Sequence, residues 1–284
     1  MILIITSNSM TQCMTVLTEP ATDATDSRRN SHREHEIMTQ LRLSGGSCRI
    51  RFLADRLQIS EQTVRRNVRG LENSGLIRKV HGGVQLVDAL SEAPFHQRMN
   101  VNESQKKAIA ATVADMISDG DSLFLDVGST TAYVAMALKN HKDLFIVTNS
   151  VGVAHTLATR NNNRVFMAAG ELRPHDGGTF GKRAIDFIEQ FNTHYAVLSV
   201  GAIHAESGFM LHDLQEATLS RVAMGCAQTT IIAGDSSKFG HRAPIQMAQF
   251  SEIDIVVTDQ PVDNNIVTLM NDNDVDIVIG AVNA

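Results

Sequence analysis

Two turns rich in glycine, serine and threonine carry residue types suited to binding an anion. The first, Gly128-Ser129-Thr130-Thr131, follows the apolar run that ends at Asp126 and precedes an alanine-rich helical stretch; the second is Thr148-Asn149-Ser150, after the next apolar run. Backbone N–H groups and hydroxyls at a helix N-terminus can hold a phosphate. Ser and Thr also cap helices for structural reasons, so each turn alone leaves both interpretations open. Two such turns at one sheet edge favour a ligand site.

Other polar side chains extend this predicted site. Arg173, in the loop over residues 170–178, is positioned to complete the anion site, and Asp213 and Glu216 can accept hydroxyl groups of a sugar or polyol. Lys238 follows another apolar run and is either a phosphate contact or an ordinary surface lysine. We expect these residues to bind one small phosphorylated molecule.

A second group of residues predicts contacts with duplex DNA. Four polar side chains recur at i, i+3, i+4 and i+7 of one helical stretch: Gln62, Arg65, Arg66 and Arg69. In the major groove, Gln can pair with adenine and Arg with guanine. Ser60 and Thr63 suit phosphate contacts, and Arg78, Lys79 and His81 follow on a predicted wing. The alternative is a solvated arginine face that packs against another protein.

The elements that must position these residues form two domains. Over residues 31–88, three short helical patterns precede two β-rich runs around His81-Gly82-Gly83, an order that predicts a winged helix-turn-helix. We expect a polar linker over residues 89–102, and a disordered extension, or residues upstream of a later start, over 1–30. Residues 103–284 alternate helical stretches with continuously apolar runs at 122–126, 144–148, 165–169, 195–200, 229–233, 253–258 and 276–279. Such runs predict an α/β domain with a mostly parallel sheet.

Composition and charge support this division. The chain has 284 residues, 43% of them apolar, which suggests about two folded domains. Its net charge of −6 divides unevenly, because residues 31–88 hold ten Arg and Lys against six Asp and Glu, and the rest therefore carries −10. A basic module on an acidic body is typical of a protein that binds DNA at one end. The low aromatic content, 5% with no Trp, argues against a single-strand binder that stacks bases.

Cysteine usage and the N-terminus indicate a cytoplasmic protein. Cys13, Cys48 and Cys226 are far apart and form no metal-binding or disulfide pattern, so we expect neither a metal nor a cofactor. The apolar run at residues 1–5 has no basic residue before it and is too short for a signal peptide or a membrane span.

The sequence resembles the DeoR family of bacterial sugar-metabolism repressors. The resemblance covers roughly residues 31–280 and rests on motifs in both domains: Ser60-Glu61-Gln62-Thr63-Val64-Arg65-Arg66, His81-Gly82-Gly83, Asp126-Val127-Gly128-Ser129-Thr130-Thr131, Thr148-Asn149-Ser150, Gly170-Glu171-Leu172-Arg173 and Asp235-Ser236-Ser237-Lys238-Phe239-Gly240. It implies a sensor domain with a fold related to ribose-5-phosphate isomerase and glucosamine-6-phosphate deaminase. It also implies repression of a carbohydrate or polyol operon, relieved when a sugar phosphate or glycerol 3-phosphate binds the Gly-Ser-Thr-Thr turn.

Three positions depart from the family pattern. Asn67 and Val68 stand where Asp and Leu are usual, and His204 stands where Asp is usual. We expect the first two to change helix docking modestly and the third to bear on the identity of the effector.

The rival interpretation is a sugar-phosphate isomerase or deaminase with a DNA-binding appendage. Such chemistry needs a positioned carboxylate base, and the sequence presents no clear pair of catalytic carboxylates. We therefore expect a repressor without catalytic residues, which binds operator DNA as a homodimer or homotetramer.

Overall fold

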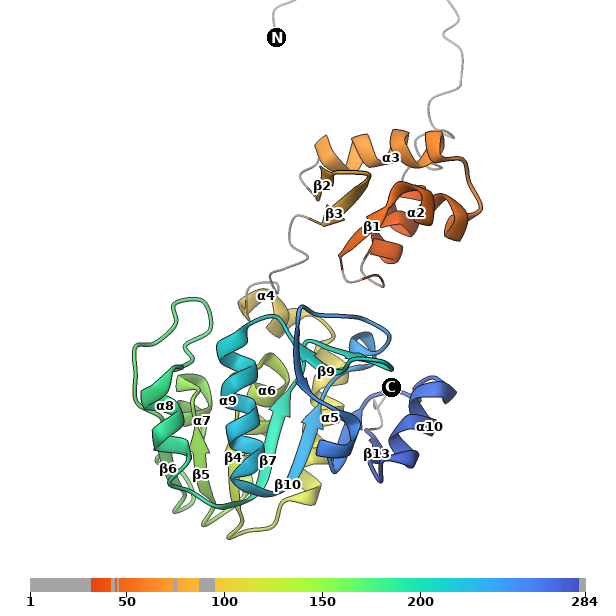
Figure 1. Cartoon of the computed structure of the whole chain (residues 1–284). Coiled ribbons are helices and arrows are strands. Elements are labelled where there is room, and N and C mark those ends of the chain that lie inside the picture. The colour runs from red at the N-terminus through yellow and green to blue at the C-terminus, as the bar shows by residue number, and fades with distance from the viewer. Residues whose placement is uncertain (1–31, 42–43, 45, 74–75, 87–94, 281–284) are drawn as a thin grey trace, which may run out of the picture.

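The computed structural model describes residues 32–41, 44, 46–73, 76–86 and 95–280 (Figure 1). The expected extension over residues 1–30 and the first part of the expected linker, through residue 94, lie outside the described residues.

The N-terminal domain is a winged helix-turn-helix, as the sequence predicts. A helix over residues 32–41 is followed in chain order by β1 (Ser47–Arg49), α2 (Ile50–Leu57), α3 (Glu61–Asn73), β2 (Ile77–Val80) and β3 (Gly83–Leu86). The three strands form an antiparallel sheet in the order β1-β3-β2. Strand β1 was not expected from the sequence, because its three residues are too short to show a period.

Local signals explain where the helices of this domain begin and end. Helix α2 ends at Gln58, which adopts the left-handed conformation with φ 53°. Ser60 then caps α3, because its Oγ accepts a hydrogen bond from the backbone N–H of Thr63 at 3.2 Å. Both helices bury their apolar side chains in one cluster, in which Leu53 and Val64 are fully buried.

The C-terminal domain is built on a seven-stranded, fully parallel sheet. Its strand order is β13-β12-β10-β7-β4-β5-β6. The strands are β4 (Ser122–Leu125), β5 (Phe145–Thr148), β6 (Arg164–Met167), β7 (Thr193–Ser199), β10 (Ala227–Ala233), β12 (Ile255–Thr258) and β13 (Asp276–Ile279). Each corresponds to one of the seven apolar runs. They are continuously apolar because both faces of the sheet are covered.

Helices cover the two faces of this sheet (Figure 1). One hydrophobic cluster joins the sheet to α5 (Glu103–Met116), α6 (Ser129–Ala137) and α7 (Val151–Leu157). The other joins it to α8 (Lys182–Ile188), α9 (Leu214–Gly225) and α10 (Asn264–Asp272). Short 3-10 turns occupy Leu138–Asn140, Ser236–Lys238 and Phe250–Glu252.

A small antiparallel sheet was not expected from the sequence. It consists of β8 (Ala202–His204), β9 (Gly208–Leu211) and β11 (Ile245–Ala248), in the order β11-β9-β8. Its residues complete one of the two large apolar clusters: Phe209 is fully buried there and packs against Phe250.

The structure also differs from the sequence over the second half of the expected linker. Residues Phe95–Asn100 form helix α4 rather than an irregular segment. Two side chains of the C-terminal domain hold this helix through its carbonyl groups. The Tyr133 hydroxyl, from α6, donates to the carbonyl of Met99 at 3.0 Å. The buried Lys106 ammonium, from α5, donates to the carbonyls of Arg98 and Val101. Helix α4 is therefore attached to the sensor domain.

Candidate functional site

The predicted DNA contacts lie on one exposed face of α3. Its other face carries Val64, Val68 and Leu71 into the core. Among the described residues, three of the exposed side chains make no hydrogen bond or ion pair: Gln62, Arg66 and Arg69. Arg65, also exposed, pairs with Glu61 at 3.1 Å. This face is free to meet a duplex, and its role in base contacts stays a prediction.

The start of α3 and the wing hold the remaining predicted DNA contacts. Ser60 Oγ lies 2.9 Å from Thr63 Oγ1, so these hydroxyls also serve the helix cap. On the wing, Arg78 donates to Gln85 Oε1 at 2.9 Å across the hairpin, and Lys79 pairs with Glu72 of α3. His81 is exposed in the turn between β2 and β3. These contacts fix the wing to α3 while its basic side chains stay at the surface.

Asn67, where the family pattern has an acid, is 3% exposed on α3. Its amide nitrogen donates to the carbonyl of Thr63 at 2.9 Å, and its amide oxygen is buried with no hydrogen-bond partner. A carboxylate at this depth would be a buried charge, which is costly without a partner. The amide therefore suits this environment better than an ionised acid would.

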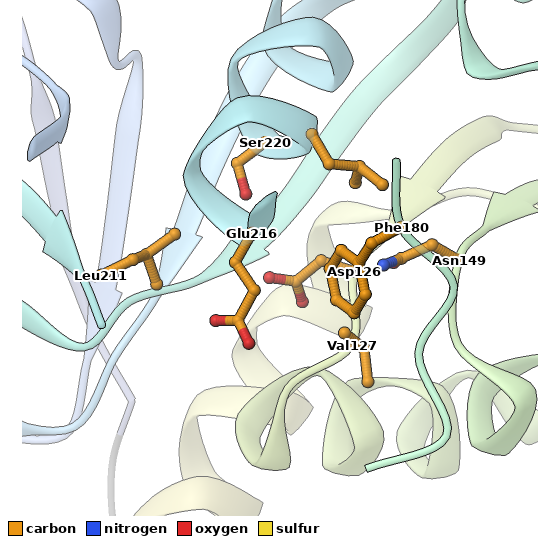
Figure 2. Close-up of a pocket in the computed structure, with 8 residues that line it drawn as sticks. Asp126, Val127, Asn149, Phe180, Leu211, Glu216 and Ser220 are labelled. Atoms are coloured by element: carbon orange, nitrogen blue, oxygen red, sulfur yellow. The ribbon is translucent and has the colours of Figure 1, made fainter. Parts of the chain in front are cut away.

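A small pocket opens at the carboxyl edge of the parallel sheet (Figure 2). It encloses about 210 Å³, open mouth included. The sequence-predicted residues Asp126, Asn149 and Glu216 meet there. They come from the segment after β4, the segment after β5 and the first turn of α9. The other lining residues are Val127, Phe180, Leu211, Leu219 and Ser220.

Asp126 and Asn149 both line this pocket, and each has one buried side-chain oxygen without a hydrogen-bond partner. Asp126 Oδ2 accepts hydrogen bonds from the backbone N–H and the hydroxyl of Ser199, both at 2.8 Å, while Oδ1 is buried without a partner. Asn149 donates to the carbonyl of Thr179 at 3.2 Å, and its Oδ1 is likewise buried and unpartnered. Unsatisfied buried acceptors are rare in proteins and call for an explanation such as a ligand.

Burial raises the pKa of the Asp126 carboxyl above its ordinary value. The nearby hydroxyl of Thr131, the two hydrogen bonds from Ser199 and the positive charge of Arg98 on α4 lower this pKa, but they offset only part of the effect of burial. The protonated, uncharged form of Asp126 is thereby favoured more than in an exposed aspartate.

The N-terminus of α6 lies next to Asp126 in the chain. Its N-cap, Gly128, provides no side-chain cap, and Ser129 and Thr130 are 6% and 3% exposed. Neither hydroxyl makes a hydrogen bond within the described residues. Gly128 is needed because a Cβ there would lie 2.1 Å from Ser199 Oγ. The turn therefore combines uncapped backbone N–H groups with two unused hydroxyls.

Four of the predicted ligand residues make local structural bonds. Thr131 donates to the carbonyls of Asp126 and Gly128, both at 3.1 Å, and Thr148 donates to the carbonyl of Leu125 at 2.6 Å. Ser150 caps α7 and Asp213 caps α9 through backbone N–H groups. These bonds shape the two turns and the start of α9, and a ligand contact by these four residues stays a prediction.

Arg173 lies beside the pocket, against the lining residues Glu216 and Phe180, and we call this side the mouth of the pocket. Acidic side chains hold it there. Its guanidinium bonds Asp176, with Nε 3.1 Å from both carboxylate oxygens, and forms an ion pair with Glu216. Asp213 Oδ2 lies 3.5 Å from Nη1. The guanidinium also stacks over Phe180, 4.0 Å from the ring centroid. Burial alone would lower the pKa of Arg173, but Asp176 and Glu216 outweigh it and raise the pKa.

Two further positions lie outside the pocket lining. Lys238 follows β10 at the same sheet edge and is half-buried; its side chain makes no hydrogen bond or ion pair among the described residues. His204 lies on β8, where its Nε2 is 3.2 Å from Arg242 Nε. Burial, together with the charge of Arg242, lowers the pKa of His204.

Sequence reasoning missed Ser199, Phe180 and Asp176. Ser199 is the last residue of β7. It could have been predicted in the same way as Asp126, because polar residues at the carboxyl ends of parallel strands meet at one edge of the sheet. Phe180 and Asp176 lie in the long segment between β6 and α8, where no periodicity predicts which side chains turn inward.

Two kinds of feature are absent from the described part of the chain. No group of three or more His, Cys, Asp or Glu side chains is placed to hold a metal ion. Among these residues no helix combines the length and the apolar character that a membrane crossing requires.

An exposed recognition helix on a winged domain, together with a pocket at the edge of an α/β domain, defines a DNA-binding transcriptional regulator with a sensor domain. Residues 33–89 match the family model of the DeoR-like helix-turn-helix domain, and residues 101–260 match that of the DeoR C-terminal sensor domain. The chain belongs to the DeoR family and is a transcriptional repressor with an effector-sensing domain.

Named relatives agree with this assignment. The chain is 33% identical to the glycerol-3-phosphate regulon repressor of Escherichia coli K12, over 86% of this chain and 97% of the relative. It is 34% identical to the transcriptional repressor CsqR of the same organism, over 86% and 94%. A regulator from Haloferax volcanii is 32% identical over 75% and 84%.

A weaker likeness connects the structure to an enzyme. Ribose 5-phosphate isomerase A from Neisseria gonorrhoeae matches with a TM-score of 0.36 and 12% identity, over 48% of this chain and 53% of that chain. This likeness adds nothing to the assignment of the site.

Proposed function

We propose that this repressor controls an operon for polyol or carbohydrate catabolism and leaves its operator when a phosphorylated polyol or sugar binds the pocket. The observation that carries the proposal is the pair of buried, unbonded oxygens, Asp126 Oδ1 and Asn149 Oδ1, beside the uncapped N-terminus of α6.

The phosphate group has a suitable site at Ser129 and Thr130. The first N–H groups of a helix carry a partial positive charge and have no partner within the helix. Helix α6 has nine residues and no side-chain cap, so its N–H groups and the two hydroxyls can together surround an anion. Arg173 supplies a guanidinium at the other side of the mouth.

The hydroxyl groups of the ligand have a suitable site at Asp126 and Asn149. Both unbonded oxygens are acceptors, and a buried acceptor left without a donor costs about 1–3 kcal/mol. Two neighbouring hydroxyls of a polyol would remove that cost. A ligand with a phosphate at one end and hydroxyls at the other therefore satisfies both ends of the site.

Relatives named glycerol-3-phosphate regulon repressor put glycerol 3-phosphate first among the ligands to test. Among members of the family, it is this repressor that residues 170–178 and 186–188 resemble most.

The ligand must favour a state of the protein that cannot bind DNA. Shifting a two-state equilibrium from 1:99 to 99:1 takes about 5.5 kcal/mol of differential affinity. In the homodimer or homotetramer that we expect, two sites would each contribute less than about 3 kcal/mol. The paired winged domains would then meet operator half-sites about one DNA turn, or a multiple of it, apart.

A thermal-shift screen of polyol and sugar phosphates tests the proposal, because a ligand that binds only the folded state raises the melting temperature. We expect glycerol 3-phosphate to raise it and glycerol to have little effect. The double variant Ser129→Ala, Thr130→Ala should keep operator binding and lose the shift. Thr268→Ala, an exposed threonine on α10, should behave like wild type. A normal response of the double variant would show that the anion site lies elsewhere.

One observation favours a second function, proton transfer on a sugar phosphate. The carboxylates of Asp126 and Glu216 face each other across the pocket (Figure 2), and paired carboxylates with different pKa values can serve as acid and base. However, the Glu216 carboxylate is engaged in an ion pair with Arg173, which holds it away from the role of a catalytic base. We therefore expect no turnover of ribose 5-phosphate or glucosamine 6-phosphate by the purified protein, and measurable turnover would establish the enzyme alternative.

A further inference from the structure

The ion cluster at the pocket mouth contains more negative than positive charge. One guanidinium, Arg173, lies within ion-pair distance of three carboxylates: Asp176, Asp213 and Glu216. An anionic ligand approaching this mouth therefore meets a cation that is already neutralised, with a net negative surplus beside it. Binding a phosphate next to Arg173 requires one of these carboxylates to leave.

The three carboxylates differ in how firmly they are held. The Asp176 side chain is 1% exposed, and besides binding Arg173 it accepts a hydrogen bond from the backbone N–H of Gly178 at 3.0 Å. Hydrogen bonds from Arg173 and Gly178 outweigh its burial, so the pKa of Asp176 lies below its ordinary value. Asp176 is thus a fixed anchor that orients the guanidinium over Phe180.

Asp213 is also committed elsewhere. Its carboxylate caps α9, accepting from the N–H groups of Gln215 at 2.7 Å and Glu216 at 3.1 Å. Its distance to Arg173 is 3.5 Å, and its side chain is 44% exposed, so the surrounding water weakens this attraction.

Glu216 differs from both, because its carboxylate bonds Arg173 and also lines the pocket. It stands at the end of a flexible side chain, facing Asp126 (Figure 2). The enclosed part of the pocket that it lines has room for about one water molecule, far less than the roughly 300–1,000 Å³ typical of ligand sites. Moving Glu216 away from Arg173 would both enlarge the pocket and free a guanidinium edge.

We propose that Glu216 is a built-in competitor of the effector: it occupies Arg173 while the pocket is empty and is displaced by the anionic group of the ligand. This inference rests on the proposed function of the pocket. Glu216 then sets the effector concentration at which the repressor leaves DNA. A ligand that binds must replace the bond between Glu216 and Arg173. The protein therefore binds the ligand less tightly than it would if Glu216 were absent.

The exchange keeps the guanidinium paired throughout. Asp176 holds Nε, the effector's anion takes the position that Glu216 leaves on Nη2, and Glu216 turns toward solvent or accepts a hydroxyl. An arginine side chain stays protonated in proteins, so the charge of Arg173 does not change during the exchange. Only the anion bound to it changes.

Calorimetric titration of the full-length protein with glycerol 3-phosphate and with inorganic phosphate tests this inference. In Glu216→Gln the side chain keeps its size but loses its charge. We expect the Kd for glycerol 3-phosphate to fall at least about tenfold, which corresponds to about 1.4 kcal/mol at 25 °C. Inorganic phosphate should also bind more tightly to this variant. The effector concentration that releases operator DNA should fall by the same factor.

The matched control is Glu206→Gln. Glu206 also pairs with an arginine, Arg242, but its side chain is 78% exposed and does not line the pocket. This variant should titrate like wild type. Asp213→Asn removes a charge from the same mouth while keeping a good helix cap, and we expect a gain smaller than about threefold because its bond to Arg173 is longer.

The outcomes separate the two proposals. If wild type binds glycerol 3-phosphate and Glu216→Gln binds it equally or less tightly, the competitor role is wrong and the pocket assignment stands. If neither protein binds any polyol or sugar phosphate, the proposed function fails and the competitor role fails with it. Should Glu216→Gln fold poorly, a crystal structure of wild type with the ligand decides: Glu216 still bonded to Arg173 would overturn the inference.

Discussion

Replacing Gly128 with alanine should damage the sensor pocket without straining the backbone. Gly128 has φ −152°, an extended conformation that alanine adopts readily. The obstacle is steric, because the new Cβ would lie 2.1 Å from Ser199 Oγ, 2.6 Å from Ser199 Cβ and 2.9 Å from Thr131 Oγ1. Ordinary contacts begin at 3.4 Å, so Ser199 would have to move by more than an ångström.

The magnitude follows from what Ser199 does. Forcing an extra carbon into a packed site typically costs about 1–3 kcal/mol. Moving Ser199 also weakens the two 2.8 Å hydrogen bonds that it donates to Asp126, and each hydrogen bond to a partner of this kind contributes on the order of 1 kcal/mol. We therefore expect Gly128→Ala to lower the free energy of unfolding by about 3 kcal/mol. For a domain of this size, each kcal/mol corresponds to a drop of about 2–4 °C in Tm.

Urea denaturation and effector titration measure the two consequences. The control is Gly225→Ala at the end of α9, where an added Cβ meets nothing within 4 Å. This variant should be as stable as wild type or more stable by up to about 1 kcal/mol, because alanine restricts the unfolded chain. If Gly128→Ala stayed within about 0.5 kcal/mol of wild type and bound effector normally, the close packing of Gly128 on Ser199 would be refuted.

Three further perturbations test the other parts of the molecule. Arg66→Ala removes an exposed, unbonded side chain, so operator binding should weaken by about 1–3 kcal/mol with Tm unchanged, and normal gel-shift affinity would exclude a base contact. Leu53→Ala should lower the free energy of unfolding of the winged domain by about 2–5 kcal/mol, because Leu53 is fully buried in its core. This variant should lose DNA binding but still bind effector in calorimetry, and retained operator binding would contradict the prediction. Asp126→Asn should change the pH dependence of unfolding. Because burial raises the pKa of Asp126 in the folded state, its contribution is fully present below the unfolded pKa of about 3.9 and is lost as pH rises through the folded value. The variant should therefore gain stability relative to wild type as pH increases from 4, and a constant difference in urea titrations would show that Asp126 keeps an ordinary pKa.

The sequence predicts the parallel sheet well because its strands are buried on both faces. Runs such as 144–148 and 276–279 are continuously apolar, and their ends agree with the strands within three residues. The helix-turn-helix is also predictable, since Ser60 is a clear helix start and the apolar spacing of α3 is regular. The small sheet of β8, β9 and β11 escaped prediction because its three- and four-residue strands are shorter than any periodic pattern.

The sequence predicts that the candidate site residues come together, but it does not predict which partners they bond. Asp126 and Asn149 follow adjacent strands, so their meeting at one sheet edge follows from parallel topology alone. The partners of each side chain depend on tertiary contacts that no local pattern encodes. Arg173 and Glu216 are 43 residues apart, and only the fold shows that they neutralise each other.

Helix α4, the first element after residue 94, is held only lightly to the sensor domain. None of its six residues is fully buried, and its carbonyl groups are fastened by Tyr133 and Lys106. Segments with few buried apolar contacts open at low free-energy cost, far below global unfolding. Effectors typically shift such equilibria by about 1–3 kcal/mol, which is the scale of one or two polar bonds. Tyr133 belongs to α6, which begins two residues after the pocket residue Val127, so the bond that holds α4 lies less than two helical turns from that end of α6.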